Sequence, residues 1–308
     1  MKKMKEVIGI MKDKASQSKA AILSKRKTLS LLRATTHDSF APPAHKHLTT
    51  LLSSGDGSRA TASTAVELLM DRLQTTHNSA VALKCLIAVH HIIKHGAFIL
   101  RDQLSVYPYT GGRNYLNLSN FRDKTSSVSW ELSSWVRWYA QHIEHLLCAS
   151  RILGYFLGET ISHEESVSSL VTSDLLREID SLVAMMEGIG KRPNSPIMEQ
   201  QNKVVVEIMD LVEDDGVVVV NEVLVRVKEF GERERLGCLG FGEVVELVCV
   251  LKRLEMCRER MVMVMEEKKF WNLVRELKEK VGKMKVYREE GKVYRTVGKD
   301  RGTESVRF

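Results

Sequence analysis

Residues 79–96 read SAVALKCLIAVHHIIKHG, and this stretch decides the fold. Its side chains are apolar on most sides when they are placed at helical spacing, and Gly96 closes the segment. A helix that is apolar around most of its circumference must be covered by other elements. The stretch therefore predicts a central buried helix in an all-α protein.

The segments on either side continue this helical pattern. Residues 61–78 (TASTAVELLMDRLQTTHN) have apolar residues at 3–4 spacing. After an extended loop, residues 130–157 form a long segment that is rich in tryptophan. The valine-rich run 216–230 also follows helical spacing, because charged residues break any strict alternation. We expect eight to ten helices joined mostly by short loops, followed by a polar, aperiodic tail at 286–308.

The charge of the chain is concentrated at its beginning. The 308 residues carry a formal net charge of +7. Residues 1–50 hold eleven Lys or Arg and three acidic residues, a charge of +8, so the rest of the chain has a charge of −1. Such a local excess indicates a polyanionic partner, either a lipid surface or a nucleic acid. No apolar run approaches the roughly 20 residues that span a bilayer.

Ten histidines raise the question of a metal site or a catalytic site. His91 and His95 have the i, i+4 spacing of a zinc pair, but HHIIKH offers no carboxylate nearby and predicts a core histidine pair. The segment HIEH at 142–145 is interpreted as a solvated helix face. Phosphate-binding glycine loops and nucleophile-elbow motifs are absent from the sequence. We expect a non-enzymatic protein without a metal or a cofactor.

The stretch RATTHDSFAPPAHKHL at 33–48 places cations where an anion would be favoured. Its proline pair predicts a helix start, so His45, Lys46 and His47 face the positive end of the helix dipole. Unpaired N–H groups of the first turn together with these side chains predict a phosphate site. Arg33, at the end of the preceding helix, is expected to close the site from the other side.

The N-terminal segment MKKMKEVIGIMKDK predicts an amphipathic helix. Its apolar stripe is flanked by lysines and consists of Met1, Met4, Val7, Ile8 and Met11. Two interpretations remain open: the stripe lies in a membrane interface, or it packs on the protein's own domain.

Four segments in order, LLRATTHD…PPAHKHL, ALKCLIAVHHIIKHG, YLNLSNFRDK and WVRWYAQHIEHLL, resemble the ANTH domain of endocytic clathrin assembly proteins. The resemblance runs over residues 5–260 and is nearest to the plant members of this ENTH/ANTH superfamily. It implies a right-handed helical solenoid with a C-terminal helical bundle. The implied domains are a basic amphipathic helix at 1–18, an ANTH domain at 19–285 with a lipid-binding half (19–160) and a C-terminal half (161–285), and a flexible tail at 286–308.

The resemblance also implies binding of phosphatidylinositol 4,5-bisphosphate. Arg33, Lys46 and His47 match the family's lipid motif, whereas Leu29 and Ala44 stand where the family has basic residues. Because histidines are involved, headgroup binding is expected to strengthen as the pH falls through roughly 6.5. The neighbouring basic residues expected to support the site are His45 and Lys27.

The remaining implications concern membranes and partners. Family members insert an amphipathic helix into the membrane, a role that here falls to Met4, Ile8 and Met11. The resemblance implies a cytoplasmic, peripheral membrane protein of clathrin-coated pits and vesicles, with the Golgi apparatus as a further location and an R-SNARE as a further partner. Clathrin as a partner rests on the resemblance alone, since NPF, DPF and a clathrin box are absent. The DLL at 174–176 falls in a predicted helix and is expected in the core.

The alternative from another class is a helical nucleic-acid-binding protein that uses the same basic segment. The sequence has no recognisable reading helix or RNA-binding module, and its aromatic residues cluster at 130–139, outside that segment. We therefore predict no nucleic-acid partner.

Overall fold

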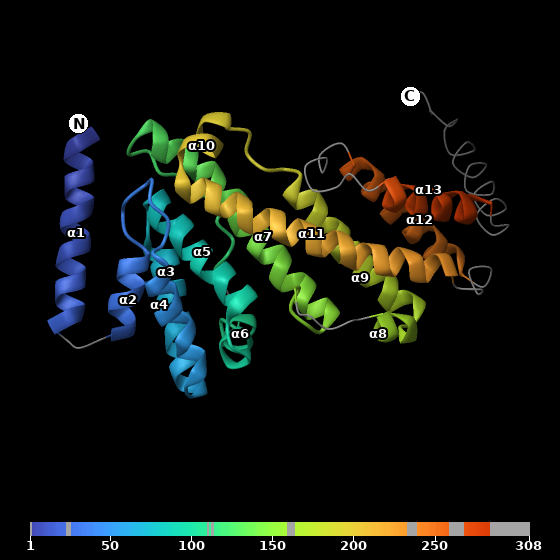
Figure 1. Ribbon diagram of the computed structural model, residues 1–308, viewed down its shortest axis with the longest axis horizontal. Coiled ribbons are helices and arrows are strands. Elements are labelled where there is room, and N and C mark those ends of the chain that lie inside the picture. The colour runs from blue at the N-terminus through green and yellow to red at the C-terminus, as the bar shows by residue number, and fades with distance from the viewer. Residues whose placement is uncertain are drawn as a thin grey trace, which may run out of the picture. The chain divides into compact units, whose positions relative to one another are not determined.

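The computed structural model describes residues 2–22, 26–109, 111, 114–158, 164–232, 239–258 and 268–283. Every regular element in these ranges is helical, which confirms the all-α prediction (Figure 1). The chain divides into two compact units. Unit 1 comprises Met1–Glu159 and Lys191–Asp215, and unit 2 comprises Thr160–Gly190 and Gly216–Phe308. The domain limits inferred from the sequence stay predictions, and the tail at 286–308 lies outside the described residues.

Unit 1 contains most of the N-terminal helices. They are α1 (Lys2–Ile22), α2 (Arg26–Ala34), α3 (His45–Leu52), the short 3-10 helix η1 (Ser53–Asp56), α4 (Arg59–Thr75), α5 (Ser79–His95), α6 (Phe98–Ser105), α7 (Ser127–Leu153), α10 (Pro196–Gln201) and the first part of α11 (Lys203–Glu232). Helix α1 ends at Ile22, and Ala20 in its last turn is buried.

Unit 2 holds the remaining helices. They are α8 (Glu164–Ser169), α9 (Thr172–Ile189), the second part of α11, α12 (Phe241–Cys257) and α13 (Lys268–Gly282). The described ranges therefore contain thirteen α-helices, more than the eight to ten predicted. The difference arises because α6, α8 and α10 have only six to eight residues, too few to repeat the apolar spacing over several turns.

The core of unit 1 is built on α5 and α7, which lie side by side (Figure 1). Nearly every residue of α5 from Ser79 to Ile93 is buried, as predicted for residues 79–96. Trp135 and Tyr139 of α7 are fully buried against it. Each helix begins after a side-chain cap: Asn78 Oδ1 accepts the N–H of Val81 at 3.0 Å, and Ser126 Oγ accepts the N–H of Ser129 at 3.0 Å.

Unit 2 is organised around the packing of α9 on α12, with α13 packed on α12. The apolar residues of α13 repeat at 3–4 spacing and are buried: Phe270, Val274, Leu277 and Val281. Leu175 and Leu176 of the DLL segment are buried in α9, so the prediction that this segment belongs to the core is confirmed. The valine-rich run is helical within α11, also as predicted. Among the described residues, no helix is both long and apolar enough to cross a bilayer.

Candidate functional site

Helix α3 begins at His45, so its first turn carries two of the predicted histidines and the lysine between them. Ala44 is the N-cap residue, with extended backbone angles (φ −68°, ψ 127°), and no side chain caps the helix within the described structure. The sequence predicts that the two prolines open the helix. In the structure they precede it, because the helix begins at His45. The N–H of His47 is also not free, because it donates to the Ala44 carbonyl at 2.9 Å. The first turn contains no acidic residue to offset the helix dipole.

The side chains of this turn differ in their surroundings. Lys46 is exposed and His47 is half-buried. His45 is exposed, but its Nδ1 lies 3.3 Å from the Thr49 hydroxyl, so the ring lies along its own helix. Leu48 and Leu51 are buried. They hold α3 against the core and leave the basic side chains at the surface.

The structure brings Arg33, Lys46 and His47 together, and we refer to these three residues as the basic cluster. Arg33 is exposed in the last turn of α2, which packs on α3. Burial, together with the positive charges of Lys46 and Arg33, lowers the pKa of His47 below its ordinary value. Lys27 is half-buried near the start of α2, nearly two turns from Arg33, and no described contact joins it to the cluster.

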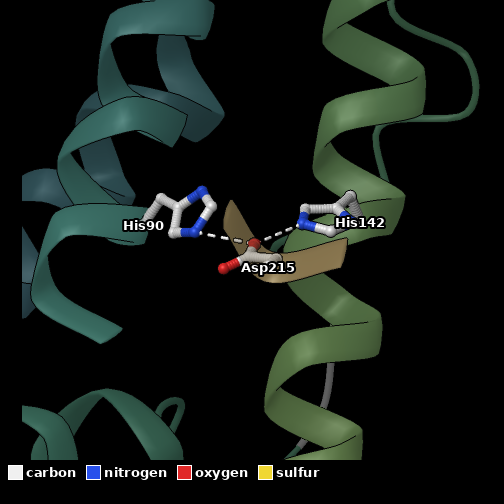
Figure 2. A group of neighbouring side chains, drawn as sticks. All are labelled: His90, His142 and Asp215. Carbon is white, nitrogen blue, oxygen red and sulfur yellow. Dashed lines mark hydrogen bonds and ion pairs between the residues drawn. The ribbon is translucent and has the colours of Figure 1, made fainter. Parts of the chain in front are cut away.

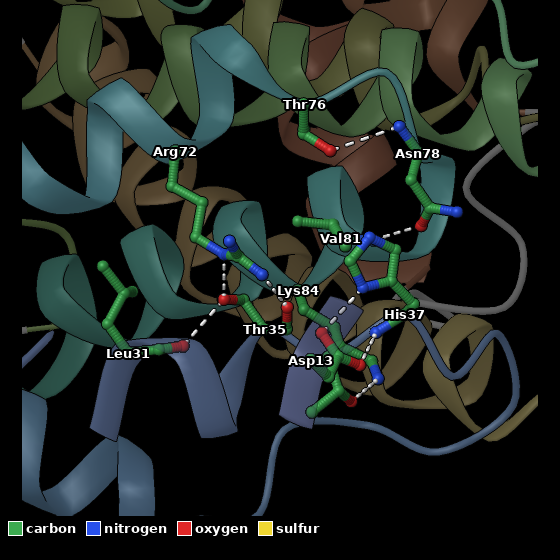
Figure 3. Close-up of polar contacts among 10 residues, drawn as sticks. Asp13, Leu31, Thr35, His37, Arg72, Thr76, Asn78, Val81 and Lys84 are labelled. Carbon is green, nitrogen blue, oxygen red and sulfur yellow. Dashed lines mark hydrogen bonds and ion pairs between the residues drawn. The ribbon is translucent and has the colours of Figure 1, made fainter. Parts of the chain in front are cut away.

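The loop that leads from α2 toward α3 is held by buried or half-buried cations (Figure 3). Arg72 of α4 donates from Nε to the Thr35 hydroxyl at 2.5 Å and from a terminal nitrogen to the Thr35 carbonyl at 2.6 Å. Lys84 of α5 donates to the Thr36 hydroxyl at 2.9 Å. Burial lowers the pKa of Lys84 to about 8, against the opposing effect of neighbouring carboxylates. These bonds fix the position of Arg33 just before the loop.

Helix α1 is attached to the same loop through Asp13 (Figure 3). The Asp13 carboxylate accepts the backbone N–H of His37 at 2.9 Å and contacts its ring Nδ1 at 2.7 Å. Burial disfavours the charged carboxylate, but these bonds outweigh burial and lower the pKa of Asp13. A Cβ added at Gly9 would lie 3.0 Å from the His37 Cβ, so the missing side chain lets the helix approach closely.

The apolar stripe of α1 faces away from this attachment. Val7, Ile8 and Met11 are 52%, 44% and 64% exposed, respectively, whereas Gly9 is buried. This exposure favours the interpretation in which the stripe lies in a membrane interface, which stays a prediction. The side chain of Met4 lies outside the described structure.

A cluster of polar side chains, separate from the basic cluster, is buried where α5, α7 and α11 meet inside unit 1 (Figure 2). Asp215 Oδ2 lies 2.9 Å from His90 Nε2 and 2.7 Å from His142 Nε2. Its other oxygen lies 3.2 Å from Lys94 Nζ, and His90 Nδ1 lies 2.8 Å from the Tyr139 hydroxyl. Burial raises the pKa of Asp215, but the two histidines outweigh it, so the carboxyl pKa lies far below its ordinary value.

These contacts correct two predictions about histidine. His142 of the HIEH segment is fully buried rather than solvated, and its partner is the buried carboxylate of Asp215 on α11, not the neighbouring Glu144. His91 and His95 are not a core pair: His91 is half-buried, with its Nε2 3.4 Å from Glu207, and His95 is exposed. The carboxylates near HHIIKH are thus present, but they come from a helix more than 100 residues later.

The group formed by His90, His142 and Asp215 has the side chains of a metal site, and their donor atoms lie within 4.8 Å of one another. Ligands of a tetrahedral zinc ion are about 3.3 Å apart when the metal–ligand bonds are about 2.0 Å. The separations of 2.9 and 2.7 Å are shorter than this: His142 is hydrogen-bonded to Asp215, His90 forms a close ion pair with it, and Lys94 already balances the carboxylate. We interpret the group as a link that fixes α11 to α5 and α7.

Sequence reasoning missed the residues that hold this surface in place. Asp13, Arg72 and Lys84 were assigned no role, although Lys84 is the one charged side chain in the run 79–89. A lysine inside such an apolar run signals a buried amine with a partner. That signal identifies the residue but not the partner.

Comparison with known proteins agrees with this architecture. The family model for the ANTH domain matches residues 28–216, a range that includes the basic cluster and Asp215 but not α1 or Lys27. Three proteins of Arabidopsis thaliana, each named "Putative clathrin assembly protein", are similar over most of the chain. One is 50% identical over 98% of this chain and 88% of its own. The others are 35% identical (82% and 77% covered) and 31% identical (91% and 100% covered).

Proposed function

Because this chain belongs to the ANTH domain family, we propose that it is a non-enzymatic, phosphoinositide-binding adaptor of clathrin-coated pits and vesicles. It acts on the cytoplasmic face of the membrane as a peripheral protein and links lipid to the clathrin coat. The names of its relatives support the clathrin part of the proposal. The Golgi apparatus and an R-SNARE partner belong to the same proposal and rest on family membership.

The observation that carries the lipid part is the basic cluster. Arg33, Lys46 and His47 converge from two packed helices at the uncapped start of α3, where the helix dipole also favours an anion. A phosphoinositide headgroup is a compact polyanion, and each lysine or arginine near an anionic leaflet contributes about 1 kcal/mol. His45 lies in the same turn as Lys46 and His47, whereas Lys27 adds positive charge farther along α2.

Helix α1 supplies the second membrane contact. Its apolar residues Ile8 and Met11 are exposed, and Met4 follows the same spacing. Asp13 attaches the opposite side of the helix to the loop that follows Arg33, so lysines and apolar side chains are presented beside the basic cluster. An amphipathic helix of this kind lies in the interface with its apolar face among the acyl chains.

The double variant Lys46→Ala/His47→Ala tests the lipid site. We expect its partition onto liposomes containing phosphatidylinositol 4,5-bisphosphate to fall about five- to tenfold, since about 1 kcal/mol is lost with the lysine and more with the protonated histidine. Liposome co-sedimentation with and without this lipid measures the effect. The matched control is Lys191→Ala/His95→Ala, which removes an exposed lysine and an exposed histidine elsewhere in unit 1. Equal binding by the wild type and Lys46→Ala/His47→Ala would refute the site.

The pH dependence of lipid binding tests the role of His47 separately. In the free protein the pKa of His47 lies below 6.5, and a bound phosphate raises it again, so binding takes up a proton. Affinity should therefore increase as the pH falls from 7.5 to 5.5, by about tenfold for each unit of difference between the two pKa values.

The lipid phosphate also titrates in this range, with a pKa near 6 for phosphate monoesters. The informative quantity is therefore the ratio of wild-type to His47→Ala affinity at each pH, measured on the same liposomes. A ratio that rises toward acid pH supports the assignment, and a constant ratio contradicts it.

A further inference from the structure

Unit 1 contains a cleft of about 640 Å³ that is separate from the basic cluster. Its walls come from α1, the loop after α2, the end of α4 and the first residues of α5 and α7. Arg33, Lys46 and His47 do not line it. Its volume is within the range of sites that hold small molecules or short peptides, about 300 to 1,000 Å³.

The charged side chains that line the cleft are all basic. Lys12 and His77 are exposed and stand at its rim, whereas Arg72 and His37 are half-buried. Arg72 uses Nε and one terminal nitrogen for Thr35, which leaves its other terminal nitrogen as a donor within the described structure. The carboxylate of Asp13 is turned to His37 and is 12% exposed, and that of Asp123, which accepts bonds from Thr125, is buried. The lining therefore favours a negatively charged occupant.

The same cleft also has an apolar part. Val81 at the start of α5 is buried, Val128 at the start of α7 is half-buried, and Phe40 in the loop after α2 is 45% exposed. Figure 3 shows Arg72, Val81 and His37 near one another although they come from α4, α5 and the loop. A fully polar inositol phosphate would leave these apolar side chains without contacts, whereas bulky apolar groups would cover them.

We propose that this cleft binds a short peptide segment of a partner protein that combines acidic residues with bulky apolar residues. The acidic side chains contact Lys12 and His77 at the rim and the free donors of Arg72. The apolar side chains cover Val81, Val128 and Phe40. The site is distinct from the basic cluster, because it uses none of Arg33, Lys46 and His47, although Ile8 and Lys12 of α1 also line it.

The probe is a set of fluorescein-labelled hexapeptides, each with two glutamates, two leucines and two serines in a different order. Binding to the full-length protein is measured by fluorescence anisotropy. For each peptide, one counterpart has lysines in place of the glutamates and another has serines in place of the leucines. We expect at least one acidic, apolar peptide to bind about tenfold more tightly than both of its counterparts. If none does so, the proposal is overturned.

The variant Lys12→Glu/His77→Glu reverses the charge at the rim without touching the bonds of Arg72. We expect it to weaken binding of the selected peptide about tenfold or more, which corresponds to 1.4 kcal/mol for each factor of ten. Both residues are exposed, so thermal unfolding followed by circular dichroism should not change. The matched control Lys14→Glu/Lys19→Glu reverses two exposed lysines of α1 that do not line the cleft. Equal losses in the two variants would overturn the proposal.

A titration with inositol 1,4,5-trisphosphate separates a headgroup pocket from a peptide site. If this compound binds and Lys12→Glu/His77→Glu abolishes its binding while no peptide binds, the cleft is a headgroup site and the proposal is wrong. The variant Lys46→Ala/His47→Ala separates this proposal from the lipid site. If it still binds the peptide, the peptide site in the cleft is supported, whether or not the basic cluster proves to bind lipid.

Discussion

Replacing Asp215 with alanine should lower the free energy of unfolding of unit 1 by about 3 to 5 kcal/mol, the usual cost of removing one partner of a buried ionic group. The carboxylate is 5% exposed and contacts His90, His142 and Lys94. Without it, two buried imidazoles and a largely buried ammonium lose their shared acceptor. Urea denaturation followed by tryptophan fluorescence measures the loss, because three of the four tryptophans lie in α7.

The adjacent residue provides a matched control. Asp214 lies on the same helix 3.6 Å from Lys94, but its side chain is 75% exposed. Asp214→Ala should change the free energy of unfolding by less than about 1 kcal/mol, as for other surface ion pairs. Asp215→Asn keeps an acceptor oxygen without the charge and should fall between the two. Similar losses for Asp214→Ala and Asp215→Ala would show that burial of the carboxylate is unimportant.

Replacing Arg226 with methionine should destabilise unit 2 by a similar amount, about 3 to 5 kcal/mol. The guanidinium is 1% exposed and joins α11 to α9: it lies 2.8 Å from a Glu178 oxygen and 2.6 Å from a Glu222 oxygen. Methionine retains much of the volume but removes the buried cation that both carboxylates contact. Hydrogen exchange of the α9 amides, measured by mass spectrometry, reports the opening of this unit specifically.

Two further variants test whether unpaired charge is the cause. Arg177→Met removes an arginine of α9 that is 64% exposed and, among the described residues, is paired with partly exposed Asp174, so hydrogen exchange of the α9 amides should barely change. Arg226→Met/Glu178→Met removes one of the carboxylates as well and should recover part of the lost protection, because apolar replacements of buried ion pairs are often tolerated. If the double variant is less stable than Arg226→Met, loss of packing rather than unpaired charge explains the effect.

The sequence alone determined the helical fold class and the uneven distribution of charge along the chain. Periodicity is a local property, so the buried helix at 79–96, the helical character of the valine run and the core position of Leu175 and Leu176 were all readable from spacing. The excess charge of the first 50 residues is likewise a matter of composition. Four ordered segments, from the one around Arg33, Lys46 and His47 to WVRWYAQHIEHLL, were sufficient to indicate the family. Short helices such as α10 were not predicted, because six residues are too few for the apolar spacing to repeat over several turns.

Only the tertiary structure decided which polar residues meet. Asp215 reaches His90 and His142 across 125 and 73 positions of the chain, and Asp13 reaches His37 across 24. No local pattern encodes such pairs, because they depend on which helix faces pack together. The exposure of Met11, the burial of His142 and the lowered pKa of His47 follow from the same packing. Spacing along a helix states which residues share a face, but the neighbours of that face determine whether a charge is solvated, paired or available to a ligand.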